Sequence, residues 1–108
     1  MTAIKLDFDK QDGLMPVIVT DHKTKQVLML AYMNEEAFEQ TKKTKQMHYW
    51  SRSRQEIWHK GATSGHYQDV VGLSTDCDQD TLLAEVKQTG AACHTGAYSC
   101  FFTPIDLN

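Results

Sequence analysis

The sequence predicts a β-rich α+β domain that spans residues 1–108 and contains one or two short helices. Three observations indicate this class. Short runs of β-branched and aromatic residues recur along the chain, one segment carries the signals of a helix, and the prolines and glycines are scattered rather than gathered in a linker. A chain of 108 residues is long enough for one hydrophobic core but too short for two. We therefore expect a single domain with a mixed or antiparallel sheet.

The first two strands are predicted as a hairpin, and a helix follows them. Apolar runs at Val17–Val19 and Val27–Met33 flank the polar, turn-like segment Asp21–Lys25. Asn34 is a good N-cap for a helix over about Glu35–Thr44. Acidic and basic residues at the two ends of this helix match its dipole: Glu35 and Glu36 first, then Lys42, Lys43 and Lys45. Five further strands are predicted at Gln46–Arg52, Ile57–Lys60, Tyr67–Thr75, Thr81–Lys87 and Ser99–Thr103.

The composition disfavours several classes of partner. The formal net charge of -3 lacks the basic excess of a general nucleic-acid or acidic-membrane binder, so we expect neither partner. The first ten residues alternate apolar and charged side chains and contain no secretion signal. The longest apolar stretch, Val27–Met33, is far shorter than the roughly 20 residues of a membrane-spanning helix. We expect a soluble, cytoplasmic protein whose three cysteines are reduced thiols.

Three carboxylates alternate with other residues in one short segment, at Asp76, Asp78 and Asp80, and Cys77 lies between the first two. In an extended chain the three aspartates share one face and Cys77 points to the other. Converging carboxylates favour a hard cation such as Mg²⁺, whereas a thiolate prefers zinc. An EF-hand is excluded, because Thr81 and Lys87 stand where its glycine and glutamate are required. The alternative is a solvated acidic turn that closes a hairpin.

Two more thiols lie near the C-terminus, at Cys93 and Cys100, and His94 is adjacent to the first of them. Three cysteines supply three zinc ligands and leave one coordination position open, which is the pattern of a catalytic zinc site. The alternative treats Cys77 and Cys93 as small buried hydrophobic residues and His94 as a surface residue. The sequence contains no CxxC pair, so spacing alone leaves both interpretations open.

The middle of the chain concentrates cations, hydroxyls and flat rings, in the segments Tyr49–Arg54, Trp58–Gly61 and Thr63–His66. Guanidinium, ammonium and hydroxyl groups bind phosphate esters, and tryptophan can stack on a purine. A phosphorylated nucleotide would therefore fit here. The alternative is an amphipathic strand that places Trp50 and Trp58 in the core and the arginines in solvent.

Several segments of the chain form a recognisable series: Asp12–Leu14 with Pro16, Leu28–Asn34, Tyr49–Arg54, Trp58 with Lys60–Gly61, Thr63–Gly65, Asp76–Asp78 with Asp80, Cys93–Gly96 and Ser99–Phe101. In this order and with this cysteine spacing, they closely resemble the phosphoribosyl-AMP cyclohydrolase family over nearly the whole chain. Two positions depart from the family pattern. Ala62 stands where members usually carry an acidic residue, and Lys25 stands where a turn glycine is common.

The resemblance implies hydrolysis of the adenine ring of phosphoribosyl-AMP between ring nitrogen 1 and carbon 6. The product is the formimino-aminoimidazole carboxamide ribonucleotide, in the third step of histidine biosynthesis. The resemblance also implies a barrel-like homodimer that uses zinc and magnesium. Carried over to this chain, it assigns zinc to Cys77, Cys93 and Cys100, with Cys77 supplied by the dimer partner, and Mg²⁺ to Asp76, Asp78 and Asp80. Substrate contacts are expected from Trp50, Ser51, Arg52, Ser53, Arg54, Trp58, Lys60, Thr63 and Ser64.

Ring opening requires a nucleophile at carbon 6 and a proton for the leaving nitrogen. Zinc with three protein ligands lowers the pKa of its bound water to about 7 and so supplies hydroxide at neutral pH. His94, and after it His59 and His66, are the candidates for proton transfer. Two rival functions are a structural zinc module that binds nucleotide or nucleic acid, and a deaminase. The acidic net charge disfavours the first, and the missing deaminase signature disfavours the second.

Overall fold

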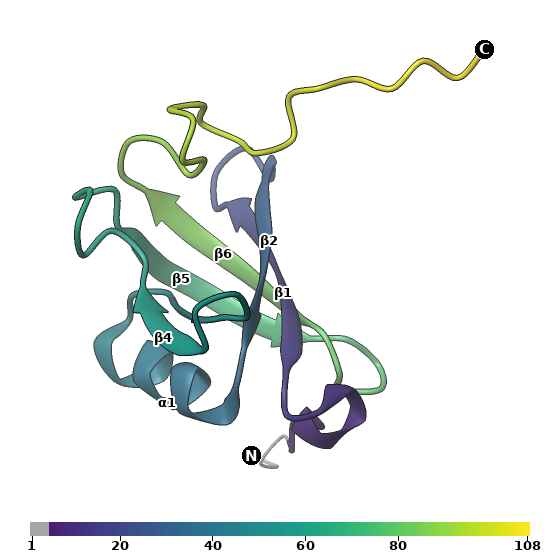
Figure 1. Cartoon of the computed structure of the whole chain (residues 1–108), viewed down its shortest axis with the longest axis vertical. Coiled ribbons are helices and arrows are strands. Elements are labelled where there is room, and N and C mark those ends of the chain that lie inside the picture. Colours follow the sequence, from purple (N-terminus) through teal and green to yellow (C-terminus); the bar gives the residue numbers. More distant parts are fainter. Residues whose placement is uncertain (1–4) are drawn as a thin grey trace.

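The computed structural model describes residues 5–108 and contains six strands, one α-helix and one short 3₁₀ helix in that range (Figure 1). The first four residues, part of the segment in which no secretion signal is expected, lie outside the described residues. In chain order the elements are η1 (Phe8–Gln11), β1 (Met15–Asp21), β2 (Val27–Met33), α1 (Glu35–Thr44), β3 (His48–Ser51), β4 (Glu56–His59), β5 (Gln68–Thr75) and β6 (Leu82–Gln88).

The predicted mixed sheet is confirmed. Four strands form a sheet in the order β2-β1-β6-β5, and β3 and β4 form a separate antiparallel pair. Strand β1 pairs antiparallel with β2 and parallel with β6, and β5 pairs antiparallel with β6. Residues Lys45 to Met47 connect the two sheets, because Met47 N–H donates to Gln68 O and Val70 N–H donates to Lys45 O. The larger sheet of the described chain is open, with β2 and β5 at its edges.

The helix occupies the predicted residues, and its ends have clear causes. The Asn34 side chain accepts a hydrogen bond from Ala37 N–H at 2.8 Å, which satisfies one of the free donors of the first turn. Lys45 ends the helix in the left-handed conformation, and its N–H donates to Thr41 O. Ala37 and Thr41 form the buried side of α1, so the helix covers one face of the sheet.

The first hairpin is also confirmed, and it explains one departure from the family pattern. In the turn between β1 and β2, the Asp21 carboxylate accepts hydrogen bonds from the N–H groups of Lys23 and Thr24. Lys25 has a φ of 65°, in the left-handed region that favours glycine. The backbone therefore requires here the conformation that glycine adopts without strain. The Lys25 side chain pairs with Glu85 on β6, a contact that glycine could not make.

One predicted strand is wrong. The structure has no strand at Ser99–Thr103, where the chain bends and then extends away from the rest of the molecule (Figure 1). The Cys100 N–H donates to Leu28 O at 2.7 Å, and residues 101–108 are exposed. Apolar and aromatic composition suggested a strand, but a strand also needs a neighbour with which to share a ladder of hydrogen bonds. The other four predictions hold with shifted ends; β3, for example, begins at His48 instead of Gln46.

The core lies between the larger sheet and the layer formed by α1, β3 and β4. Tyr49 of β3 is fully buried there, and its hydroxyl bonds to the Gln68 side chain of β5. Other fully buried side chains come from alternate positions of β1 and β6, including Val17, Val19 and Val86. Among residues 5–108, no helix is long and apolar enough to cross a membrane.

Candidate active site

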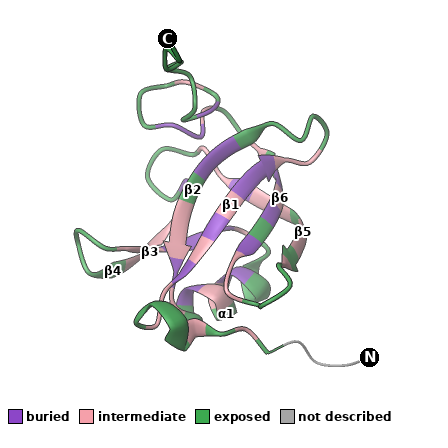
Figure 2. Cartoon of the chain, turned by 90° about the vertical axis from the view of Figure 1, so that its right-hand side faces the viewer, coloured by how far each residue is buried: buried purple, intermediate pink, exposed green. Residues whose placement is uncertain are grey.

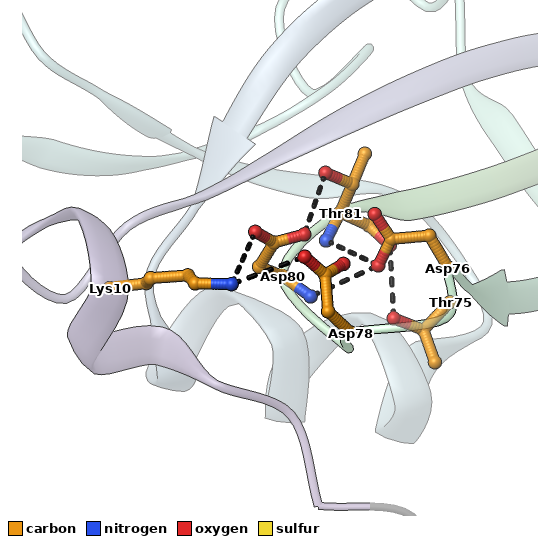
Figure 3. Close-up of polar contacts among 6 residues, drawn as sticks. All are labelled: Lys10, Thr75, Asp76, Asp78, Asp80 and Thr81. Carbon is orange, nitrogen blue, oxygen red and sulfur yellow. Dashed lines mark hydrogen bonds and ion pairs between the residues drawn. The ribbon is translucent and has the colours of Figure 1, made fainter.

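The acidic cluster lies in the turn that connects β5 and β6 (Figure 3). Carboxylate oxygens of Asp76, Asp78 and Asp80 all lie within 4.8 Å of one another. The segment is a tight turn rather than an extended chain, so the side-chain alternation assumed from the sequence is wrong. The cluster forms because Asp76 Oδ1 accepts from the backbone N–H groups of Asp80 and Thr81, at 3.1 and 3.2 Å, and so closes the turn.

A cation of the chain itself already contacts this cluster. Lys10 Nζ lies 3.1 Å from Asp78 Oδ2 and 3.1 Å from Asp80 Oδ2 (Figure 3). Hydrogen bonds to these two carboxylates raise the pKa of Lys10 to about 12. Three close carboxylates with accessible oxygens match the ligand preference of a hard divalent ion. The residue types and their spacing therefore fit magnesium, and Lys10 is a contact of this cluster that sequence reasoning missed.

Two thiols, those of Cys93 and Cys100, come together beyond the C-terminal end of β6. Cys93 is 8% exposed, and its sulfur accepts a hydrogen bond from Thr95 Oγ1 at 3.1 Å. This bond lowers the pKa of the Cys93 thiol, whereas burial raises the pKa of Cys100. The Gly96 N–H donates to Cys93 O and so turns the loop back on itself. Two neighbouring thiols, one of them with a lowered pKa, are ligands of the type that zinc prefers.

The third cysteine does not join this pair within one chain. Cys77 is exposed in the β5–β6 turn, whereas Cys93 and Cys100 follow the other end of β6 (Figure 1). Seven residues of β6 separate the two ends, which corresponds to about 20 Å at the usual rise of a strand. Three thiol ligands at one zinc therefore require a second chain.

Many of the residues predicted from the middle of the chain line a cleft of about 330 Å³ next to Cys93. Residues from three segments of the sequence line this cleft together: Trp58, Lys60, Gly61, Thr63, Ser64, His66, Ala91, Cys93, His94 and Gly96. Thiol, imidazole and hydroxyl groups thus face the same space. This cleft joins the C-terminal thiol loop to the Thr63–His66 segment, which the sequence could not place together.

Lys60 also lines this cleft, but its ammonium group donates a hydrogen bond to a backbone carbonyl of the chain. The residue is 8% exposed, and its Nζ donates to Ala92 O at 2.6 Å. Burial lowers the pKa of Lys60, and its Nζ also lies 5.0 Å from the centre of the Trp58 ring. The ammonium therefore anchors the loop that carries Cys93.

The three candidate histidines occupy different places. His94 is exposed at the cleft, and His66 lines it against Gly90, whose missing Cβ would lie 2.5 Å from His66 Cδ2. His59 instead stacks on His48 with ring centroids 4.2 Å apart, and its Nε2 lies 2.9 Å from Gln46 Oε1. Burial lowers the pKa of His59. His94 and His66 thus share the cleft with Cys93, and His59 lies outside its lining.

A second cleft, of about 590 Å³, lies on the other side of Trp58. It is lined by Trp50 and the turn residues Ser51, Arg52, Ser53 and Arg54, together with Tyr32 and Leu30 of β2. The Arg52 guanidinium lies 4.1 Å from the centre of the Tyr32 ring. This cation–π contact holds the Arg52 side chain against another residue of the cleft lining. Tyr32 was predicted only as part of a strand, so its support of Arg52 was missed.

An α+β fold whose clefts combine thiols, imidazoles, hydroxyls and arginines is typical of a small enzyme acting on a phosphorylated substrate. The family model described as Phosphoribosyl-AMP cyclohydrolase matches residues 29–102. A phosphoribosyl-AMP cyclohydrolase of Streptococcus thermophilus is 74% identical over 97% of this chain and 94% of that protein. One of Lactiplantibacillus plantarum is 59% identical over 96% of each chain. The chain therefore belongs to the phosphoribosyl-AMP cyclohydrolase family.

A longer relative shares the same region. A histidine biosynthesis bifunctional protein of Lactococcus lactis is 62% identical over 92% of this chain, which corresponds to 46% of that protein. The name of that relative refers to histidine biosynthesis.

Proposed function

We propose that this chain hydrolyses the adenine ring of phosphoribosyl-AMP between ring nitrogen 1 and carbon 6, within histidine biosynthesis. Family membership supports the reaction. The observation that carries the proposal is the cleft in which Cys93, His94 and His66 face Thr63 and Ser64. It combines a metal-binding group, proton carriers and phosphate ligands, which a hydrolase of a phosphorylated nucleotide requires.

Two metal sites belong to the proposal. Zinc would be held by Cys93 and Cys100 of one chain and Cys77 of the other, because the structure separates the thiols in this way. When bound, zinc supplies an acidified water at neutral pH. Mg²⁺ would be held by the acidic turn, where it can neutralise a substrate phosphate or polarise the purine. Reduced thiols at this site are consistent with a location in the cytoplasm.

The chain's own residues bind and orient the substrate. Arg52 and Arg54, with the hydroxyls of Ser51 and Ser53, would bind one phosphate at the larger cleft. Thr63 and Ser64 would bind polar groups of the nucleotide at the smaller one, and the Trp58 ring between the clefts offers a stacking surface, as does Trp50. Lys60 would act indirectly, by holding the Cys93 loop.

The imidazole of His94 would move a proton between water and the leaving nitrogen, because it is exposed beside Cys93. His66 is the second candidate from the same cleft. A role for His59 would require it to leave its stack on His48.

The reaction is tested by adding purified protein to phosphoribosyl-AMP and following the ultraviolet change on ring opening. We expect turnover that stops in a Cys93→Ser variant and after removal of metal by a chelator. The rival function, a structural zinc module, predicts zinc binding without any ring opening. Deaminated product in place of the opened ring would also reject the proposal.

The shared zinc site is tested by mixing two inactive variants, Cys77→Ser and Cys93→Ser. In a heterodimer with ligands from both chains, one site has both defects and the other keeps a wild-type copy of each cysteine. Co-refolding should therefore restore activity. Heterodimers that are confirmed by mass and remain inactive would reject the shared site, because ligation within one chain leaves a defect in each site.

A further inference from the structure

The turn of the β3–β4 hairpin carries two arginines of the larger cleft, Arg52 and Arg54. Figure 2 shows this hairpin beside β2, with its turn exposed. The backbone of the turn is closed by hydrogen bonds, from Gln55 N–H to Ser51 O at 2.8 Å and from Arg54 N–H to Ser51 Oγ at 3.3 Å. The Gln55 amide also donates to Arg52 O at 2.8 Å. These contacts fix the backbone of both arginines, although their side chains are exposed.

The two arginine side chains have different neighbours. Nη1 of Arg54 lies 3.6 Å from Glu56 Oε1, in an ion pair whose members are both exposed. The Arg52 guanidinium instead lies over the Tyr32 ring, 4.1 Å from the ring centre, and no carboxylate of residues 5–108 pairs with it. Arg54 therefore shares its charge with an acidic neighbour, whereas Arg52 does not.

A contact with the face of a ring leaves the donors of Arg52 available. The attraction acts between the positive charge and the electrons of the ring, so it requires no N–H group. The five N–H donors of a guanidinium lie in its plane and match two oxygens of a phosphate. A carboxylate partner would occupy these donors, but the Tyr32 ring does not. The guanidinium of Arg52 is thus held in place while its phosphate-binding groups stay unoccupied.

Placement before binding matters for a side chain as long as arginine. An exposed arginine loses rotamer freedom when it binds a ligand, and this loss weakens binding. The Tyr32 ring limits that freedom in advance. Tyr32 is half-buried on β2 and pairs with Pro16 of β1, so the larger sheet sets its position. Tyr32 and Arg52 line the same cleft, which connects the sheet to the hairpin turn.

We propose that Tyr32 is a positioning residue that holds Arg52 for a phosphate monoester group of the substrate. Tyr32 acts through Arg52, and its own hydroxyl makes no contact that the role requires. This inference rests on the proposed function, which places a substrate phosphate at the larger cleft. It adds that a ring of the sheet prepares one of the two arginines for that phosphate.

The test compares Tyr32→Leu, which removes the ring, with Tyr32→Phe, which keeps it, in steady-state kinetics with phosphoribosyl-AMP. We expect about a three- to tenfold rise in KM for Tyr32→Leu, as for the lost placement of one side chain, with kcat changed less than about twofold. Tyr32→Phe should keep both constants close to those of the wild type. Tyr32→Leu is then combined with Arg52→Ala and, as the matched control, with Arg54→Ala. The rise in KM should disappear in the first combination and persist in the second.

Circular dichroism shows which variants are folded, and Tyr32→Met replaces Tyr32→Leu if the latter is unfolded. A folded ring-less variant with wild-type KM, or a rise that persists beside Arg52→Ala, would overturn the positioning role while the phosphate role of Arg52 stands. An equal rise in Tyr32→Phe would assign the effect to the hydroxyl and overturn it as well. An Arg52→Ala enzyme with wild-type KM would reject the phosphate role and the positioning role together. A wild-type protein that opens no ring would reject the proposed function itself, and this inference with it.

Discussion

Lys60 Nζ donates a hydrogen bond of 2.6 Å to the carbonyl oxygen of Ala92, the residue before Cys93. The contact joins the end of the β3–β4 pair to the loop that carries the thiol, across 32 residues of sequence. Burial leaves this ammonium few other partners, and it also helps to lower the pKa of Cys93 through its charge. A lysine that composition assigned to a phosphate thus holds the loop that carries Cys93.

Replacement of Lys60 by methionine tests this anchoring role. Methionine keeps most of the apolar length of the side chain but leaves Ala92 O without its donor. The free energy of unfolding, measured with urea, should fall by about 1–3 kcal/mol, and zinc should be lost to a chelator at a lower concentration. The anchoring role would be contradicted if the Lys60→Met protein had wild-type stability and zinc retention but a raised KM. Lys60 would then be a substrate-binding residue.

Replacement of Lys10 by methionine should strengthen magnesium binding. The Lys10 ammonium contacts two carboxylates of the acidic turn, so a metal ion must displace it. Since this ion pair is exposed, we expect only about a two- to fivefold lower dissociation constant for Mg²⁺, measured by calorimetry. Lys42→Met removes an exposed lysine on α1 and serves as the control. Weaker Mg²⁺ binding in the Lys10 variant would show that the ammonium supports the metal site instead of competing for it.

Replacement of Asp78 by asparagine should separate the two metal sites. The carboxylate lies in the acidic turn, at the opposite end of β6 from Cys93 and Cys100. Activity should then need at least about tenfold more Mg²⁺, as expected for one lost charged ligand, while zinc content stays close to that of the wild type. A parallel loss of zinc, measured by elemental analysis, would instead indicate one common site.

Replacement of Arg52 and Arg54 by alanine should weaken substrate binding. Both guanidinium groups line the larger cleft, and Arg52 is oriented by the Tyr32 ring. Each lost charged hydrogen bond corresponds to about a tenfold rise in KM, with a smaller change in kcat. Steady-state kinetics of the single and double variants provide the measurement. Unchanged kinetics in the double variant would place both arginines in solvent without a role in binding.

Stability at low pH should depend on the contact between Tyr98 and Asp21. The Tyr98 hydroxyl donates to the Asp21 carboxylate and lowers the pKa of Asp21 from 3.8 to about 2. Since the folded-state value is the lower one, the ionised carboxylate stabilises the fold above pH 3.8, and this contribution is lost as the pH falls toward 2. Tyr98→Phe removes the donor. The free energy of unfolding, measured with urea, should therefore fall less steeply with decreasing pH in the variant than in the wild type. Parallel pH curves for the two proteins would contradict the assignment.

The sequence by itself determined the elements that depend on near neighbours. The Asn34 cap, the charges along α1 and the apolar runs on either side of a polar turn act within a few residues, so the hairpin and helix appear as predicted. The acidic turn was identified from its composition, although the turn geometry that gathers Asp76 with Asp80 came from backbone hydrogen bonds. The residue types near Cys93 and in the middle of the chain likewise indicated which kinds of ligand they could bind, but not how the residues are arranged in space.

Only the tertiary structure decided which of these groups meet. It turned Lys60 toward Ala92, stacked His59 on His48, and left the segment at Ser99–Thr103 without a partner strand. It also separated Cys77 from Cys93 by the length of β6. Such placements depend on contacts between residues far apart in sequence, and packing selects these contacts for the chain as a whole. Local propensity cannot predict these long-range contacts, because it describes only the backbone near each residue.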